Sequence, residues 1–413
     1  MSRADLGPAA AERAARIDLG AVRHNVGVLR ERIRRPDGTR PLLTAVVKAD
    51  AYGHGAVAVA RAAAAAGADR LGVAHVREAL ALRAAGAHLP VLAWLHTGAT
   101  DFAAAVEADV TLGVSGWDLD AVADAVRGLR ARDGAGPDVR AVLHLKADTG
   151  LGRHGCPPER WPAFVARAAE LEAAGLVRVE GVFSHLGVAD EPDRAAETTA
   201  QLLRFERMAA EAAETLGHPL LRHLANTPAT LARPDTHLDM VRVGLGLYGL
   251  SPFEDVTAAE LGLRPAMSLV TALANVKAVP AGQGVSYGFR HITAEPTVLG
   301  LVPVGYADGV PRVAEGARVH VGGRAVPVVG RIAMDQFVVD LGPDATDAPG
   351  DAVELFGPAS GIPVEEWAAA AGTINYELVT RIGGRVDREH VDAEALAGPP
   401  PIPDPASTQE ARP

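Results

Sequence analysis

Short apolar runs alternate with longer amphipathic stretches over the first two thirds of the chain. Eight runs rich in leucine and β-branched residues have the length expected of buried strands. They are Leu42–Val47, Arg70–Ala74, Val91–Leu95, Val110–Val114, Ala141–Leu145, Val179–Phe183, Leu220–Leu224 and Met240–Leu245. The segments between them, such as Asp118–Arg132 and Pro158–Ala174, carry apolar residues at helical spacing. This alternation predicts parallel strands joined by helical crossovers.

The number of strand and helix units favours an α/β fold of the (β/α)₈ type, the TIM barrel. Eight units within about 250 residues is the size of that fold. A doubly wound open sheet would give much of the same alternation. The polar residues Lys48, Lys146, His185 and Asn226 each stand at or just beyond the carboxyl end of a predicted strand. Barrel enzymes gather their chemistry at that end, so this placement favours the barrel.

The pattern changes after about Pro252 to strand-like runs separated by Gly, Pro and Asp, which predicts a mostly β C-terminal domain. The runs are Leu269–Val279, Thr297–Val304, Arg318–His320, Ala325–Val329 and Phe337–Leu341. Repeated prolines and few apolar residues in Gly398–Pro413 predict disorder at the end of the chain. We therefore expect a flexible N-terminus (residues 1–12), a barrel (13–252), a β domain (253–392) and a disordered tail (393–413).

Composition narrows the functional classes. The 413 residues, 48% of them apolar, are enough for a barrel and a second domain. The net charge is −11, and acidic and basic residues are interspersed, so the sequence predicts no basic surface for nucleic acid or an anionic membrane. Met1–Arg16 lacks the apolar core of a secretory signal, and no apolar window is long enough to span a bilayer. The single cysteine, Cys156, excludes an internal disulfide and a multi-thiolate metal site. These features predict a soluble cytoplasmic protein without a metal.

Lys48 stands at the end of a buried strand, just before a glycine-spaced turn. A lysine in such a place ordinarily reaches solvent. A free ammonium is a poor nucleophile and base at neutral pH, but a Schiff base to an aldehyde cofactor removes that obstacle. The segment from Val46 to Gly55, VVKADAYGHG, resembles the motif that carries the cofactor lysine in alanine racemases. Similar matches recur from about Ile17 to about Val386 and so cover both predicted domains.

The resemblance implies that Lys48 binds pyridoxal 5′-phosphate and assigns the other cofactor contacts to several further motifs. Segments 146–153, 184–190, 223–227 and 241–249 each resemble a family motif. Arg153 would contact the phenolic oxygen, His185 would stack on the pyridine ring, and Thr227 would bind the phosphate with its hydroxyl where the family often has serine. The full set of implied cofactor residues is Lys48, Tyr52, Arg153, His185, Asn226, Thr227, Arg242, Gly244, Leu245 and Tyr376.

Arg242 of this set bears on the electronics of the cofactor, and His223 and Lys146 are implied as supporting residues. The resemblance places Arg242 opposite the pyridine nitrogen, with His223 supporting it by a hydrogen bond. A fixed guanidinium there should keep the nitrogen unprotonated, because like charges repel. The cofactor then stabilises a carbanion less well, which should suppress transamination. In some family members the lysine equivalent to Lys146 is carbamylated, which leaves a carbamate and an unmodified lysine in an ion pair as alternatives here.

Racemisation needs one proton acceptor on each face of the planar intermediate, so Lys48 alone is not sufficient. Segment 284–288 resembles the motif that bears the second base, which would be Tyr287. Further matches at 303–309, 330–335 and 373–377 imply an entry channel and a substrate pocket. The residues implied there are Tyr306, Tyr376, Arg153, Met334 through its amide, and Asp335 in a supporting role. The family is a homodimer, so Tyr287 would act across the subunit interface.

The predicted function is therefore the interconversion of L-alanine and D-alanine, with D-alanine supplied to peptidoglycan. One alternative is a broader racemase that also accepts serine, because the sequence does not give the volume of the substrate pocket. A second is a barrel-type pyridoxal-phosphate decarboxylase, although those enzymes pair the pyridine nitrogen with a carboxylate and use a cysteine in the β domain. Here the residue expected opposite the pyridine nitrogen is Arg242, and the only cysteine lies in the predicted barrel. A non-catalytic barrel that binds the cofactor would be smaller and would lack the β domain.

Overall fold

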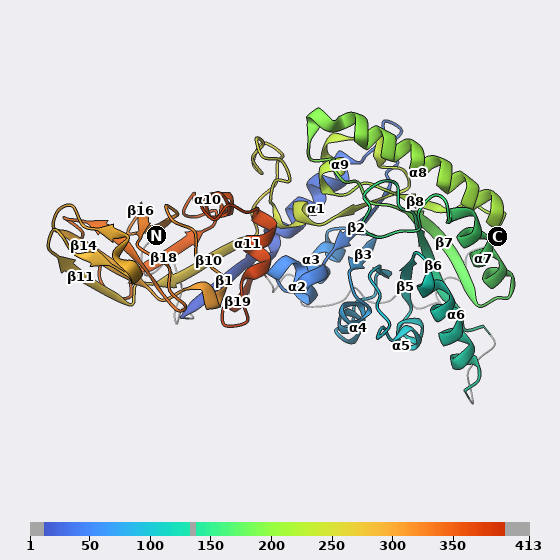
Figure 1. Ribbon diagram of the computed structural model, residues 1–413, viewed down its shortest axis with the longest axis horizontal. Helices are drawn as coiled ribbons and strands as arrows, with labels where there is room; N and C mark the ends of the chain where they lie inside the picture. Colours follow the sequence, from blue (N-terminus) through green and yellow to red (C-terminus); the bar gives the residue numbers. More distant parts are fainter. Residues whose placement is uncertain (1–11, 133–137, 393–413) are drawn as a thin grey trace, which may run out of the picture.

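The chain forms two domains side by side, a barrel and a mostly β domain (Figure 1). The structure is a computed structural model that describes residues 12–132 and 138–392. The predicted disordered tail, and the predicted flexible N-terminus apart from Glu12, lie outside the described residues. The predicted fold class, a (β/α)₈ barrel followed by a mostly β domain, is confirmed. No helix in the described ranges is long and apolar enough to cross a membrane.

Eight parallel strands form the barrel in the hydrogen-bonded order β8-β7-β6-β5-β4-β3-β2-β9. They are β2 (Leu42–Val46), β3 (Arg70–Val73), β4 (Val91–Ala93), β5 (Val110–Val114), β6 (Ala141–Lys146), β7 (Val177–Phe183), β8 (Leu221–His223) and β9 (Met240–Val243). Each of the eight predicted runs overlaps one of these strands, and only β6 and β7 extend beyond the predicted bounds. The barrel is closed between β8 and β9, where Asp239 N donates to Arg222 O (3.1 Å) and Arg242 N donates to Ala225 O (3.0 Å).

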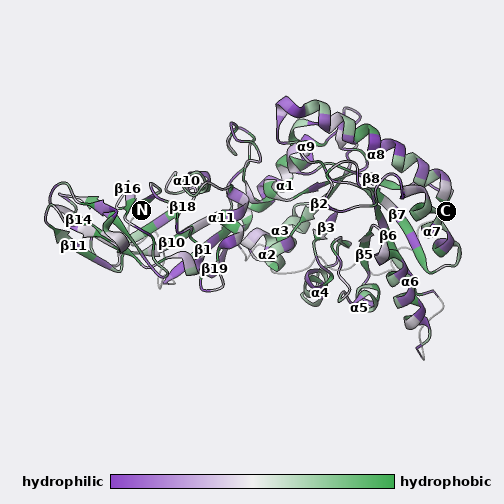
Figure 2. Cartoon of the chain, in the orientation of Figure 1, coloured by the Kyte–Doolittle hydropathy of each residue, from purple (hydrophilic) through white to green (hydrophobic). Residues whose placement is uncertain are grey.

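Helices cover the outside of the barrel. They are α1 (Leu19–Arg32), α3 (Ala56–Ala65), α4 (Val76–Ala84), α5 (Phe102–Glu107), α6 (Trp117–Arg130), α7 (Trp161–Ala173), α8 (Ala195–Leu216) and α9 (Thr227–Ala232). The predicted helices over 118–132 and 158–174 correspond to α6 and α7. Hydrophilic residues recur along α8 in Figure 2, as expected of a helix with one face in solvent. Its inner face buries Leu202, Phe205 and Met208.

A nine-stranded sheet in the order β11-β14-β17-β16-β15-β18-β10-β1-β19 forms the second domain, with a separate β12–β13 pair. These strands are β10 (Met267–Ala272), β11 (Asn275–Val279), β12 (Gly284–Val285), β13 (His291–Ile292), β14 (Thr297–Val302), β15 (Arg318–Val321), β16 (Arg324–Val329), β17 (Phe337–Gly342), β18 (Ala352–Phe356) and β19 (Asp387–Val391). The domain also contains α10 (Val364–Ala370) and α11 (Asn375–Arg381).

Two features of this sheet differ from the sequence prediction. Strand β1 (Arg13–Asp18), which the prediction grouped with the barrel, pairs antiparallel with β10 and parallel with β19. Its position just before α1 gives no sign of these distant partners. The run predicted as one strand over 269–279 is divided into β10 and β11, because the chain changes partner there. Leu273 N donates to Asp351 O beside β18, whereas Ala274 N donates to Leu301 O in β14.

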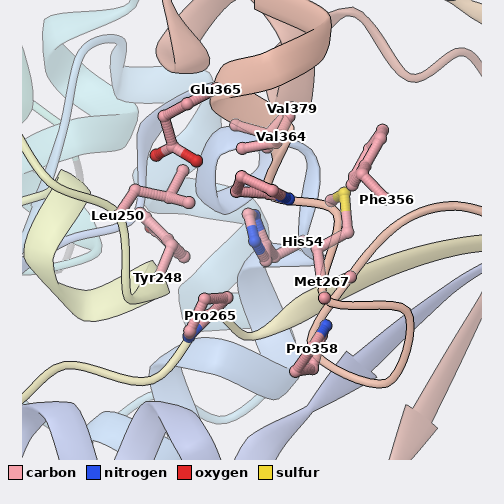
Figure 3. Close-up of a pocket in the computed structure, with 13 residues that line it drawn as sticks. His54, Tyr248, Leu250, Pro265, Met267, Phe356, Pro358, Val364, Glu365 and Val379 are labelled. Atoms are coloured by element: carbon pink, nitrogen blue, oxygen red, sulfur yellow. The ribbon is translucent and has the colours of Figure 1, made fainter. Parts of the chain in front are cut away.

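The two domains meet beside the turn that follows β2. Arg388 in β19 donates to the carbonyl oxygen of Gly53 (3.2 Å), and His390 Nε2 lies 2.9 Å from the carbonyl oxygen of His54. Figure 3 shows a cavity at this junction, with His54 and Tyr248 from the barrel facing α10 and α11. Its walls are mostly apolar. This packing holds the segment that carries Lys48 against the second domain.

Candidate active site

A cavity of about 280 Å³ opens at the carboxyl ends of the barrel strands. The sequence analysis predicted a set of residues that contact the cofactor or support it. All but one of those outside the substrate site line this cavity. The lining residues are Val46, Lys48, Tyr52, Trp94, Lys146, Arg153, Phe183, His185, Asn226, Thr227, Pro228, Arg242, Gly244, Leu245 and Tyr376. The exception is His223, which lies behind Arg242. The barrel topology brings together side chains from Val46 to Leu245, and the packing of α11 against α2 (Lys48–Gly53) adds Tyr376 from the second domain.

Lys48 begins α2 (Lys48–Gly53), a turn with an uncommon backbone. Residues Ala49–Tyr52 all have φ between 52° and 54°, which is the left-handed region. Each non-glycine residue there costs roughly 1–2 kcal/mol, so neighbouring structure has to hold the turn. The Glu78 carboxylate accepts from Ala49 N at 2.7 Å, and Asp50 accepts from Ala56 N at 2.7 Å. Burial, and secondarily the charge of Arg153, lowers the pKa of Lys48, which favours its reactive neutral amine.

Arg242 lies on β9 and is almost completely buried, with 6% of its surface exposed. Nη1 donates to His223 Nδ1 (2.9 Å) and to the His223 carbonyl (3.0 Å), and Nη2 donates to the Ser184 carbonyl (2.6 Å). The guanidinium also lies 5.5 Å from the centre of the Phe183 ring. Burial lowers the pKa of Arg242 to about 10, so it remains a cation at neutral pH. The predicted pair of Arg242 and His223 is in direct contact.

At another side of the cavity, Thr227 and the 244–246 turn form a small polar cradle. Thr227 Oγ1 accepts from Gly244 N at 3.0 Å and lies 3.5 Å from Gly246 N. A side chain at Gly244 would collide with the Tyr52 hydroxyl, so the backbone must approach closely here. The Asn226 side chain accepts from Ala229 N (3.2 Å) and caps α9. A hydroxyl, backbone amides and a helix start are groups that bind phosphate.

Lys146 ends β6 beside two arginines. Its Nζ lies 2.8 Å from His154 Nδ1, and His154 Nε2 lies 3.0 Å from Ser115 Oγ. Burial, together with the charges of Arg242 and Arg153, lowers the pKa of Lys146 to about 7. About half of these amines are therefore uncharged at neutral pH. An uncharged amine can react with an electrophile. If the product is an anion, the cations around Lys146 would stabilise it.

Comparison with known proteins decides the family. The N-terminal domain of alanine racemase matches residues 17–252, and the C-terminal domain matches residues 266–390. The chain belongs to the alanine racemase family. An alanine racemase of Streptomyces coelicolor is 51% identical over 388 residues, which is 92% of this chain and 95% of that protein.

Solved structures agree with this placement. The alanine racemase of Streptomyces lavendulae, described as a D-cycloserine producer, has a TM-score of 0.88 and 49% identity, covering 95% of this chain and 100% of that one. The Bacillus anthracis alanine racemase with bound L-Ala-P has a TM-score of 0.78 and 33% identity, covering 93% and 96% of the two chains. Relatives this similar over nearly their full length identify the chain as an isomerase of the alanine racemase family.

The predicted residues of the β domain, apart from Tyr376, do not line the cavity of the described chain. Tyr287, Tyr306 and Met334 are 70%, 38% and 52% exposed. Tyr306 N donates to Ala333 O, next to Met334, and Ser286 Oγ donates to Arg331 O, so the three side chains share one region of the surface. Asp335 pairs with Arg385 at 2.8 Å. The two halves of the predicted site are thus on separate surfaces of one chain.

Three side chains of the site were not predicted from the sequence. Trp94 follows β4 and fits against Gly72 and Gly113 of the adjacent strands, where a side chain would collide with it. Phe183, at the end of β7, stacks on His223 with 4.9 Å between ring centres and an interplanar angle of 5°. His154 contacts Lys146. For Trp94 and Phe183 the available signal was a large aromatic residue at a strand end, and for Trp94 it was also the glycines in the adjacent strands. His154 lies in the loop after β6 and is not marked in this way.

Proposed function

We propose that the protein interconverts L-alanine and D-alanine with pyridoxal 5′-phosphate and two bases, Lys48 and Tyr287. The observation that carries this proposal is the arrangement of the barrel cavity, where Lys48, a buried Arg242 and the cradle at Thr227 face one space. We assign the activity to the cytoplasm, since the buried, unpaired Cys156 suits a reducing compartment. The D-alanine that the enzyme forms would be used for peptidoglycan.

The residues present fit the cofactor. Lys48 can bind its aldehyde, the cradle of Thr227 and Gly244 can bind its phosphate, and His185 and Arg242 can contact its ring. When bound, pyridoxal phosphate supplies an aldehyde that condenses with amines and a ring that delocalises the electrons left when the α-proton departs. Asn226, Leu245, Tyr52 and Tyr376 complete the enclosure of this space.

The protein's own groups would move the proton. Tyr287 accepts the α-proton from L-alanine on one face, and Lys48 Nζ donates a proton on the other. The two roles are exchanged for D-alanine. Arg153 and the Met334 amide bind the substrate carboxylate, and Asp335 supports the loop of Met334. The charge of Arg242 limits protonation of the pyridine nitrogen and so disfavours side reactions.

A homodimer would unite the two halves of the site. Tyr287, Phe289 and Ile292 expose large side chains on the β domain, whereas Leu95 and Trp117 do so at the barrel mouth. Exposed apolar groups of this size on two separate regions are typical of a subunit interface. In a twofold-symmetric pair the β-domain region of each subunit can cover the barrel mouth of the other. Tyr287 would then reach the cavity of the partner.

Chiral analysis of alanine tests the proposed function. We expect purified enzyme with pyridoxal phosphate to convert either enantiomer to an equal mixture, because the equilibrium between mirror images is symmetric. L-serine under the same conditions measures the breadth of the activity, and carbon dioxide release tests for a decarboxylase. Carbon dioxide in place of D-alanine, or binding of the cofactor without turnover, would contradict the proposal.

Lys146 offers a separate prediction, because about half of its amines are uncharged near neutral pH. We expect it to add to carbon dioxide, forming an N–C bond and releasing one proton to solvent. The resulting carbamate would pair with Arg153 in place of a lysine surrounded by cations. Occupancy should rise with pH through about 7, the pKa of Lys146, because only the uncharged amine reacts.

The measurement is ¹³C NMR of the enzyme in labelled bicarbonate, with Lys146→Ala as the control that removes the signal. The sequence contains only two other lysines, Lys48 and Lys277, so the assignment is simple. A native enzyme without a carbamate signal at pH 8 would show that Lys146 is an unmodified partner of His154.

A further inference from the structure

A continuous line of polar side chains runs from the cofactor cavity into the interior of the barrel. Nδ1 of His223 lies 2.9 Å from Arg242 Nη1, and Nε2 of His223 lies 2.7 Å from His144 Nδ1. Nε2 of His144 lies 3.1 Å from Oε2 of Glu180, and Arg70 Nη1 donates to the same oxygen at 2.9 Å. Both histidines are fully buried. Since Arg70 begins β3, the line leads away from the barrel mouth.

The two ends of the line determine the direction of every hydrogen bond in it. A guanidinium only donates, so Nδ1 of His223 accepts and its proton is on Nε2. That proton is donated to Nδ1 of His144, whose own proton is then on Nε2. The carboxylate of Glu180 only accepts and receives it. Burial lowers the pKa of both histidines, so both rings are neutral and each has a single tautomer.

Arg242 needs such an arrangement, because its charge is buried. Its hydrogen bonds within the described ranges go to His223, His185 and backbone carbonyl groups, and none reaches a carboxylate. A buried charge without an ionic partner is costly. Glu180 is the carboxylate at the other end of the line, and aligned hydrogen bonds strengthen one another along a chain.

We propose that Glu180 and His144 are positioning residues, which fix the tautomer of His223 and thereby the orientation of Arg242 at the cofactor ring. The inference rests on the proposed function, which places the pyridine nitrogen at Arg242. Without an acceptor at Glu180, the His144 proton moves to Nδ1 and faces the His223 proton. His223 then carries its own proton on Nδ1, where it points at Arg242 and removes the acceptor that holds the guanidinium.

A purely structural role is the competing explanation, in which Glu180 only pairs with Arg70 inside the barrel. Two variants separate the explanations, because a single oxygen of Glu180 contacts both Arg70 and His144. In Glu180→Gln the amide oxygen can still accept both hydrogen bonds, although the charge is lost. In Glu180→Leu no acceptor remains. Loss of the ion pair affects both variants, whereas loss of the tautomer affects only the second.

The decisive measurement is ¹⁵N NMR of histidine-labelled enzyme, with His144→Gln and His223→Gln to assign the signals. We expect the protons of both rings on Nε2 in native enzyme and in Glu180→Gln. In Glu180→Leu we expect the His223 proton on Nδ1 and kcat/KM for alanine about 10- to 100-fold below native. Arg178→Met is the matched control, because Arg178 lies 3.5 Å from the other carboxylate oxygen. It should match native enzyme in both readouts.

Three results would overturn the inference. They are a His223 proton on Nδ1 in native enzyme, native tautomers in Glu180→Leu whatever its activity, and native kcat/KM in Glu180→Leu despite a changed tautomer. These outcomes differ from a failure of the proposed function. The ring protons are located whether or not the protein racemises alanine, so a native protein that makes no D-alanine would refute only the function.

Discussion

Replacing Lys48 with alanine is expected to reduce alanine racemisation by at least about 10⁴-fold, because one group supplies both the cofactor bond and one of the two bases. Lys48 is the lysine with a lowered pKa at the end of β2, and the left-handed turn after it directs the residue into the cavity. Neither of the other two lysines is placed to replace it, since the amine of Lys146 contacts His154 and Lys277 lies on β11 of the second domain. The measurement is the rate of D-alanine formation at saturating pyridoxal phosphate.

Chemical rescue and a matched lysine variant sharpen this test. Methylamine should restore part of the activity of Lys48→Ala, because a small amine can enter the space of the missing side chain. Lys277→Ala should have native activity, since Lys277 is exposed on β11 of the second domain. Borohydride reduction of native enzyme should label the Lys48 peptide alone. Full racemisation by Lys48→Ala without added amine would eliminate the two-base assignment.

The barrel was predictable from the sequence because its strands and helices follow one another with local periodicity. Four polar residues of the barrel half were predictable for the same reason, since each stands at or just beyond the end of an apolar run and all parallel strands end at one face. They are Lys48, Lys146, His185 and Asn226. The roles of the other cofactor residues were implied by the family resemblance. The position of β1 was not predictable in this way. Its partners, β10 and β19, are more than two hundred residues away, and no local pattern in Arg13–Asp18 records them.

The interior of the barrel shows a second limit. His144 and Glu180 lie within the runs of β6 and β7, where alternation marks them only as polar positions in buried strands. Their contact depends on the register between these strands, which shifts between Leu143 and His144. The position of Trp94 likewise depends on neighbouring strands, because Gly72 in β3 and Gly113 in β5 leave the space for its side chain. Side chains that function through their neighbours therefore require the structure, whereas a polar residue at the end of a strand can be recognised from the sequence.

Replacing Tyr287 with phenylalanine is expected to reduce racemisation about 10³-fold, because it removes the proton carrier of one face and leaves the packing of the ring unchanged. Lys48 remains in this variant. In D₂O, Tyr287→Phe should therefore exchange the α-proton of D-alanine with solvent while retaining its configuration, and it should leave L-alanine unexchanged. Proton NMR and chiral analysis of the same sample measure both results. Equal exchange of the two enantiomers would mean that another group serves the second face.

Mixing the two inactive variants determines which chain supplies Tyr287. Its side chain is 70% exposed and does not line the cavity of its own described chain. If Tyr287 acts across the interface, a dimer of Lys48→Ala with Tyr287→Phe contains one site in which both bases are intact. Random exchange of subunits would then restore about one quarter of the native activity, since half of the dimers are mixed and each has one working site of two. If Tyr287 served its own chain, every site would lack one base and mixing would restore nothing.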